Sequence, residues 1–324
     1  MSDRVHRVVD TNGLRMHVVM QGSGPTVLLC HGFPESWYSW RSQLDALAAA
    51  GYRVVAPDMR GYGQTDQPSA IDQYSIFHLV DDMVGLLDAL EVEQAVIIGH
   101  DWGSTVAWQA ALMRPERFRA VGGLSVPFRP RPAAPPTTMW PQTDTTIFYQ
   151  TYFQEPGVAE AEFERDLRLT LRSFQFLWSG MPTAPDGGRR TMLPRDGGFL
   201  TDAKLPPTLP AWLSEADIDF YAGEFARSGF QGPLNWYRNI DRNWEQSAPW
   251  HGAAVRVPAL FMIGERDPVL TFRGMDHLVP NLEDYVPGLR VKTVVPECGH
   301  WIQREHPGIV NAALVDFLAS LDKG

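Results

Sequence analysis

An aspartate flanked by two glycines is the residue of this sequence whose setting points most directly to chemistry. Asp101 lies in residues 97–104, IIGHDWGS, a pattern that predicts a strand, a tight turn and a helix. Small residues two positions before and after a nucleophile are typical of a strained turn at the end of a sheet. A carboxylate is ionised at neutral pH, and this oxygen anion is better suited to attack a saturated carbon than an amide. The alternative is that Asp101 caps the following helix, a role in which Asp is common.

Two residues near the end of the chain complete a possible catalytic set. Asp267 and His300 each follow a predicted strand, and open α/β sheets bind their ligands at the C-terminal ends of strands. The order Asp101, Asp267, His300 is nucleophile, acid and base, which is the order of the α/β-hydrolase triad. A single loop histidine is more often a surface residue, so it is the combination of the three positions that favours a triad.

A possible oxyanion hole lies beside the same turn. Residues 31–34, HGFP, end another predicted strand, and the backbone N–H groups of Phe33 and Trp102 could point at one oxygen. A plain β-turn would also explain a Gly-Phe-Pro sequence. The position next to the Asp101 turn favours the oxyanion hole.

The elements that would position these residues alternate between strand and helix. The first two strands form a hairpin around Asn12-Gly13, a strong turn dipeptide. The expected strands are Val5–Asp10, Leu14–Met20, Thr26–Cys30, Arg53–Ala56, Ala95–Ile98, Val121–Leu124, Val257–Ile263 and Arg290–Val295. The expected helices are Ser42–Ala50, Ile76–Leu90, Ser104–Met113 and Pro307–Leu321. This alternation predicts an α/β fold with a mostly parallel sheet flanked by helices.

The middle of the chain breaks this rhythm. A Pro-rich stretch at residues 128–141 leads into an aromatic-rich, helical segment that runs from Thr145 to about Trp244, interrupted by a Gly/Pro-rich loop at 179–198. We expect a helical cap at residues 129–244, inserted into a core made of residues 1–128 and 245–324. The Pro-rich stretch could instead be a ligand for aromatic-grooved domains, but a stiff hinge into the insertion is favoured.

The composition is that of a soluble globular enzyme, with 44% hydrophobic and 20% charged residues in a chain of 324. The net charge of −10 argues against a nucleic-acid partner, because such proteins show basic patches. Two cysteines make neither a disulfide framework nor a metal cluster, and we expect no metal and no cofactor. The sequence has neither a signal-length apolar run at its start nor about 18 consecutive apolar residues, so a cytoplasmic protein without a membrane span is expected.

Six motifs spread over nearly the whole chain resemble those of epoxide hydrolases of the α/β-hydrolase fold, and are similar to the hydrolase domain of the soluble mammalian type. The motifs are HGFPESW at 31–37, DMRGYG at 58–63, GHDWG at 99–103, YFQEPG at 152–157, NWYRN at 235–239 and CGHW at 298–301. The core motifs alone would fit several hydrolase classes. The two motifs in the expected cap are the specific ones.

The resemblance implies that Tyr152 and Tyr237 activate the epoxide oxygen, because a phenol with pKa about 10 stays protonated at neutral pH and can protonate the alkoxide. Asp101 would then carry a hydroxyalkyl ester, and His300 would activate the water that releases a vicinal diol. The resemblance also suggests that Glu35 helps to place this water. Without the motifs, the simpler interpretation would be that the two tyrosines only pack within the cap and that Glu35 is a surface carboxylate.

Three other functions stay open at this point. A haloalkane dehalogenase shares the Asp nucleophile, and Trp102 could serve as one of its halide donors. Position 33, however, is Phe rather than a halide-binding side chain, and the tyrosine motifs would have no use. A non-catalytic α/β-hydrolase that serves as a ligand receptor would bind a small molecule without turnover. An esterase that used Ser104 is disfavoured, because Ser104 falls within a predicted helix. The substrates we expect are a small apolar epoxide and water, since the predicted cap is rich in Trp, Phe and Met.

Overall fold

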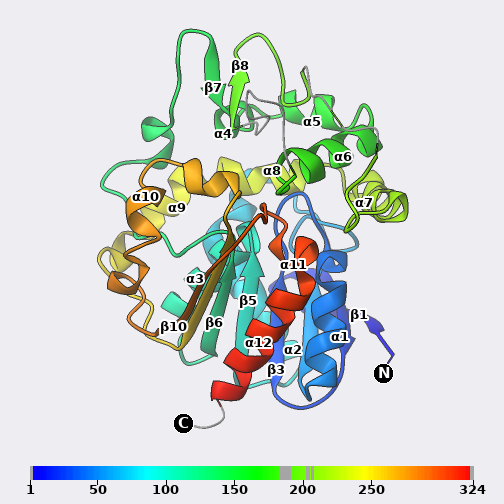
Figure 1. Cartoon of the computed structure of the whole chain (residues 1–324), viewed down its shortest axis with the longest axis vertical. Coiled ribbons are helices and arrows are strands. Elements are labelled where there is room, and N and C mark those ends of the chain that lie inside the picture. Colours follow the sequence, from blue (N-terminus) through cyan, green and yellow to red (C-terminus); the bar gives the residue numbers. More distant parts are fainter. Residues whose placement is uncertain (1–2, 182–190, 202–204, 206–207, 322–324) are drawn as a thin grey trace.

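An eight-stranded sheet runs through the centre of the protein (Figure 1). The computed structural model describes residues 3–181, 191–201, 205 and 208–321. The spatial order of the strands is β1-β2-β4-β3-β5-β6-β9-β10. β2 pairs antiparallel with both β1 and β4, and the other neighbours are parallel. The strands are β1 (Val5–Thr11), β2 (Leu14–Gln21), β3 (Thr26–Cys30), β4 (Arg53–Pro57), β5 (Ala95–His100), β6 (Phe118–Leu124), β9 (Ala259–Gly264) and β10 (Leu289–Val295).

Helices pack on both faces of this sheet, which confirms the predicted α/β class. Successive side chains of a strand point to opposite faces, so the central strands are apolar throughout. Leu29 packs in one buried cluster with Leu44 of α1 and Leu314 of α12. Leu28 packs in the other, with Met83 of α2. The long core helices are α1 (Arg41–Ala49), α2 (Ile76–Ala89), α3 (Trp102–Met113) and α12 (Pro307–Leu321).

Short helices connect these elements. They are α10 (Met275–Leu278), α11 (Ile302–Glu305), η1 (Trp37–Trp40), η2 (Ile71–Tyr74), η5 (Pro268–Thr271) and η6 (Leu282–Asp284). Among the helices in the described ranges, none combines the length and the apolar character that a membrane crossing needs.

A second group of elements lies over the C-terminal ends of the parallel strands (Figure 1), and we call the elements from η3 to α9 the cap. They are η3 (Pro136–Met139), β7 (Thr146–Phe148), α4 (Tyr149–Tyr152), α5 (Val158–Phe163), α6 (Leu167–Leu177), β8 (Met192–Pro194), α7 (Glu215–Ser228), α8 (Gln231–Arg238) and α9 (Ile240–Gln246), after which η4 (Ala248–Trp250) leads back to the core. β7 and β8 form a small antiparallel pair that the sequence did not predict. β8 lies in the expected loop 179–198, of which residues 182–190 are outside the described ranges. Its pairing depends on a strand more than 40 residues earlier, which local composition cannot indicate.

Hydrogen bonds fasten the cap to the core. The Asn239 amide donates to the Ile71 carbonyl at 2.6 Å, and the Trp236 indole donates to the Arg60 carbonyl at 3.1 Å. Both cap residues are fully buried. The helices α8 and α9 are therefore held in a fixed position over the strand ends.

Glycines permit the closest backbone contacts at these strand ends, and this leads to a prediction about stability. A Cβ at Gly99 would lie 1.9 Å from the Gly103 carbonyl oxygen, whereas a Cβ at Gly223, inside α7, would meet nothing within 4 Å. We expect Gly99→Ala to lower the free energy of unfolding by about 3 kcal/mol or more. The control Gly223→Ala should raise it by about 0.5–1 kcal/mol, since Ala is the better helix former. Urea unfolding measures both, and equal midpoints for Gly99→Ala and the wild type would contradict the steric argument.

Candidate active site

The turn between β5 and α3 holds Asp101 in a strained conformation. Its φ is 54° and its ψ is −121°, a region that non-glycine residues rarely adopt. The turn fits because its neighbours lack side chains. A Cβ at Gly103 would lie 2.0 Å from the Cys30 carbonyl oxygen, and one at Gly32 would lie 2.4 Å from the Asp101 Cβ. Asp101 is thereby fixed close to the end of β3.

The carboxylate of Asp101 does not cap the helix. Asp101 occupies the N-cap position of α3 but makes no capping hydrogen bond, which removes the alternative reading of this residue. Its Oδ1 instead accepts a hydrogen bond of 2.8 Å from the Phe33 backbone N–H. Trp102 is the first residue of α3, so no carbonyl of its own helix can accept its N–H. The two N–H groups predicted for an oxyanion hole thus flank Asp101.

His300 lies between two carboxylates, as the chain order predicted. Its Nε2 is 3.3 Å from Asp101 Oδ2, and its Nδ1 is 3.1 Å from both carboxylate oxygens of Asp267. Asp267 follows β9 and is also fixed by the Val269 N–H at 2.9 Å. His300 and Asp267 are buried. The structure therefore brings together the three residues of the predicted triad.

The charge state of His300 follows from these neighbours. Burial lowers the pKa of His300, but the carboxylates of Asp267 and Asp101 outweigh this and raise the pKa to about 10. At neutral pH the imidazole is protonated and balances the charge of Asp101. A protonated imidazole cannot accept a proton, so His300 can act as a base only after its pKa has fallen during the reaction.

Glu35 is buried in the core and is not the surface carboxylate of the alternative reading. It is 1% exposed, and its Oε2 lies 2.7 Å from His100 Nδ1 while its Oε1 accepts from Gln303 at 3.2 Å. Burial raises the pKa of Glu35, but His100, with a smaller contribution from Arg304, brings it down to about 2. His100 Nε2 in turn is 2.7 Å from the His300 carbonyl oxygen. Glu35 is therefore an ionised group in direct connection with the segment that carries His300.

Two cap tyrosines line a narrow aromatic cavity. Tyr149 of α4 and Tyr237 of α8 are both buried, and their ring centroids are 6.3 Å apart. The other lining residues are Phe33, Phe174, Trp178 and Trp301. Burial raises the pKa of Tyr149, and so does the charge of Asp101; for Tyr237 the causes are burial, then Tyr149 and Asp101. Both phenols are thus protonated hydroxyl groups within electrostatic reach of Asp101.

The structure does not bring Tyr152 to this cavity, so this predicted position is corrected. The Tyr152 hydroxyl donates a hydrogen bond of 3.0 Å to Glu162 Oε2 on α5, and its ring is only half-buried. Burial raises its pKa most, followed by the charge of Glu162 and the hydrogen bond to it. Tyr149, three residues earlier on the same helical turn, takes the position that the sequence analysis gave to Tyr152. The Tyr149 oxygen also accepts a hydrogen bond of 2.8 Å from the Gln150 amide.

Known proteins match this chain over nearly its full length. The family model for the alpha/beta hydrolase fold matches residues 25–307. Epoxide hydrolase A of Mycobacterium tuberculosis is 46% identical, covering 99% of both chains. An epoxide hydrolase from an endophytic Streptomyces superposes with a TM-score of 0.94 at 48% identity, covering 99% of this chain and 97% of that one. Epoxide hydrolase A from Mycobacterium thermoresistibile gives a TM-score of 0.89 at 44% identity, covering 98% of each. The chain belongs to the epoxide hydrolases of the alpha/beta-hydrolase fold.

In this epoxide hydrolase, sequence reasoning missed Tyr149, His100 and Gln303. Tyr149 and Tyr152 share one helical turn, so only the packing of α4 decides which ring faces the site. His100 precedes Asp101 in the GHDWG motif, and Gln303 lies two residues after the CGHW motif. Their closeness to these motifs was the signal in the sequence that could have pointed to them. Within the described ranges, no group of three or more His, Cys, Asp or Glu residues is placed to hold a metal ion.

The ion pair between Asp101 and His300 leads to a prediction about protonation. Asp101→Asn removes one of the two charges that raise the pKa of His300, and we expect this pKa to fall from about 10 by one unit or more. An NMR titration of the His300 ring resonances would measure the change. The control Asp45→Asn removes an exposed carboxylate that pairs with Arg4, and it should leave the titration unaltered. The same His300 pKa in Asp101→Asn and the wild type would contradict the coupling.

Proposed function

We propose that the protein hydrolyses epoxides to vicinal diols through a covalent hydroxyalkyl ester on Asp101. The observation that carries the proposal is the cavity with two buried phenols, Tyr149 and Tyr237, in its wall. Phe33, another wall residue, donates its backbone N–H to the Asp101 carboxylate, whose charge raises the pKa of both phenols. Epoxide opening needs both a nucleophile and a proton donor, because the leaving oxygen stays in the molecule as a basic alkoxide.

The first step forms the ester. Tyr149 and Tyr237 hydrogen-bond the epoxide oxygen while Asp101 attacks a ring carbon from the side opposite the C–O bond. The C–O bond breaks, and one phenol gives its proton to the alkoxide. Asp101 loses its charge, so the pKa of His300 falls and the imidazole releases a proton, which restores the phenol.

The second step hydrolyses the ester. Neutral His300, oriented by Asp267, takes a proton from a water molecule that attacks the carboxyl carbon of Asp101. The N–H groups of Phe33 and Trp102 stabilise the oxyanion, each by about 3 kcal/mol. The intermediate collapses to the diol and the Asp101 carboxylate, and His300 is again protonated. We assign Glu35 to placing this water, a role supported by its burial and by its bonds to His100 and Gln303.

The tyrosines also separate this function from dehalogenation. Halide leaves without a proton and is held by side-chain N–H donors, whereas the Phe33 side chain offers none and packs against the rings of Phe174 and Tyr237. The comparisons favour neither a dehalogenase nor a non-catalytic receptor, since the similar proteins are named epoxide hydrolases.

The core and the cap contribute different residues to the proposed reaction, and this supports the expected domain boundaries. We place the core at residues 1–128 and 245–324, which contribute Asp101, Asp267 and His300, and the cap insertion at residues 129–244, which contributes the tyrosines. The helix α9 runs on to Gln246, two residues past this boundary. The aromatic lining of the cavity favours a small apolar epoxide. A cytoplasmic location is supported by two buried cysteines that are both free.

A single-turnover reaction in H₂¹⁸O tests the ester. We expect the label in the Asp101 side chain and an unlabelled diol from the first turnover, measured by mass spectrometry of the peptide and the product. His300→Gln should accumulate the ester, seen as a mass increase of the intact protein equal to that of the epoxide. Label that appears directly in the first diol would mean that water attacks the epoxide itself.

A matched pair of variants on α4 tests the proton donors. Tyr149→Phe should slow ester formation by about 10²-fold, since it removes a general acid. Tyr152→Phe removes only the hydrogen bond to Glu162, so it should keep the wild-type rate of ester formation. Stopped-flow tryptophan fluorescence follows this step in both variants. A slow Tyr152→Phe beside an unimpaired Tyr149→Phe would return the role to Tyr152.

A further inference from the structure

An arginine that has no partner among the described residues stands where the chain passes from the core into the cap. Arg129 follows β6 in the segment that leads to η3, and it is exposed to solvent. In the described part of the chain, no residue forms an ion pair or a hydrogen bond with its guanidinium. An arginine side chain keeps its charge and has N–H donors but no acceptor. Arg129 therefore offers a set of unused donors to an anion, and no step of the proposed reaction uses them.

The backbone that carries Arg129 is held on both sides. Phe128 is 2% exposed, and its ring centroid lies 6.2 Å from that of Trp108 on α3. Arg131 donates from its Nε to the Trp244 carbonyl of α9 at 2.8 Å, and its guanidinium lies 4.2 Å from the centroid of the Trp244 ring. Arg129 thus projects from a fixed stretch of chain. A ligand contact with it costs less conformational entropy than one with a residue on a loose loop.

The guanidinium of Arg129 lies beside the wall of the catalytic cavity. Tyr149 lines this cavity, and its pKa is raised by burial and by Asp101 but lowered by the charge of Arg129. Opposite charges act on a pKa in this way over roughly 4–6 Å. Burial lowers the pKa of Arg129 in turn, and Tyr149 raises it. The side chain is therefore open to solvent on one side, and on the other it is surrounded by the protein that forms the catalytic cavity.

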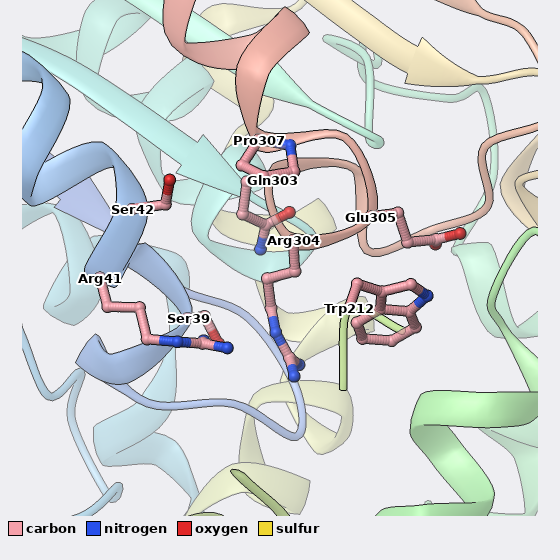
Figure 2. A pocket seen from close by; sticks show the side chains of 8 residues that line it. All are labelled: Ser39, Arg41, Ser42, Trp212, Gln303, Arg304, Glu305 and Pro307. Carbon is pink, nitrogen blue, oxygen red and sulfur yellow. The ribbon is translucent and has the colours of Figure 1, made fainter. Parts of the chain in front are cut away.

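Two other arginines that line a cavity differ from Arg129 because each has a carboxylate of the protein nearby. Figure 2 shows Arg41 and Arg304 in the wall of a second cavity, of about 220 Å³. Arg41 pairs with Asp217 at 2.9 Å, and Arg304 lies within electrostatic reach of the Glu35 carboxylate. Their charges are balanced inside the protein, whereas the charge of Arg129 is available to a ligand.

We propose that Arg129 is a specificity-determining residue that binds a carboxylate at one end of the substrate while the epoxide oxygen lies on Tyr149. The inference rests on the proposed function and narrows it to epoxides that carry an anionic group a short distance from the ring. The planar fork of an arginine matches the two oxygens of a carboxylate. Asp101 and Asp267 repel such a group and Arg129 attracts it, so the epoxide ring should enter first, with the carboxylate toward solvent.

Two substrates of the same shape and different charge test the contact, 4-(oxiran-2-yl)benzoate and 4-(oxiran-2-yl)benzamide. Arg129→Gln should lower kcat/KM for the benzoate about 10-fold, mainly through KM, because charge-assisted hydrogen bonds are lost. The value for the benzamide should stay unchanged. The control Arg15→Gln also removes one positive charge, from an exposed arginine that pairs with Asp66 at 3.4 Å, and it should behave as the wild type does with both substrates.

Two results of these kinetics would overturn the proposal. An equal loss for the benzoate and the benzamide would mean that Arg129 acts on the acidity of Tyr149 and not on a substrate carboxylate. A matching loss for the benzoate in Arg15→Gln would mean that the net charge of the protein attracts this substrate from a distance.

Inhibition of the wild type keeps the test decisive if Arg129→Gln fails to fold. 4-Ethylbenzoate should compete with the benzamide epoxide more strongly than 4-ethylbenzamide does, and this advantage should shrink as NaCl is added, because the guanidinium is open to solvent. Equal inhibition by the two compounds would overturn the proposal. Conversion of the benzamide epoxide to its diol, with no advantage for either benzoate, would remove the role of Arg129 alone. Failure of both epoxides to give a diol would also contradict the proposed function.

Discussion

The close approach of the Asp101 turn to the end of β3 is the constraint on which the rest of the active site depends. The Phe33 N–H reaches the carboxylate at 2.8 Å only because Gly32 and Gly103 carry no side chain where the two backbones meet. The positive φ of Asp101 is a strained conformation, and such strain persists where the surrounding packing leaves no alternative. Local strain and a backbone contact thus fix the position of Asp101, the proposed nucleophile, relative to the Phe33 N–H group.

Buried charges then dictate the chemistry around this turn. Asp101, Asp267 and Glu35 are carboxylates in the interior, and His300 and His100 are the imidazoles beside them. Each of these three carboxylates has an imidazole nitrogen within 3.3 Å, so none of the three negative charges is buried without a polar partner. Loss of one charge in this group changes the pKa values of the neighbouring groups, because each pKa depends on the charges beside it.

The sequence predicted where the strands end, but it did not predict which side of a short helix faces the site. Asp101, Asp267 and His300 could be placed because apolar runs mark buried strands, and parallel strands end at the same edge of a sheet. Tyr149 and Tyr152 lie three residues apart, and a four-residue helix has too few residues for its buried face to be read from periodicity. Glu35 could not be recognised as buried, since only its partners His100 and Gln303, 65 and 268 residues away, make burial affordable. In both cases the missing information was a contact between segments that are distant in the sequence, which local residue patterns do not show.

The charge of Asp101 also links the two halves of the proposed reaction. In the resting enzyme this charge raises the pKa of His300, and it contributes to the raised pKa of Tyr149 and Tyr237. Formation of the ester abolishes the charge, so all three pKa values fall in the same event. The phenols become stronger acids as the alkoxide forms and needs a proton, and His300 becomes able to lose the proton that prevents it from acting as a base. A nucleophile that is ionised at rest and neutral once alkylated therefore prepares its own hydrolysis, with no separate conformational signal.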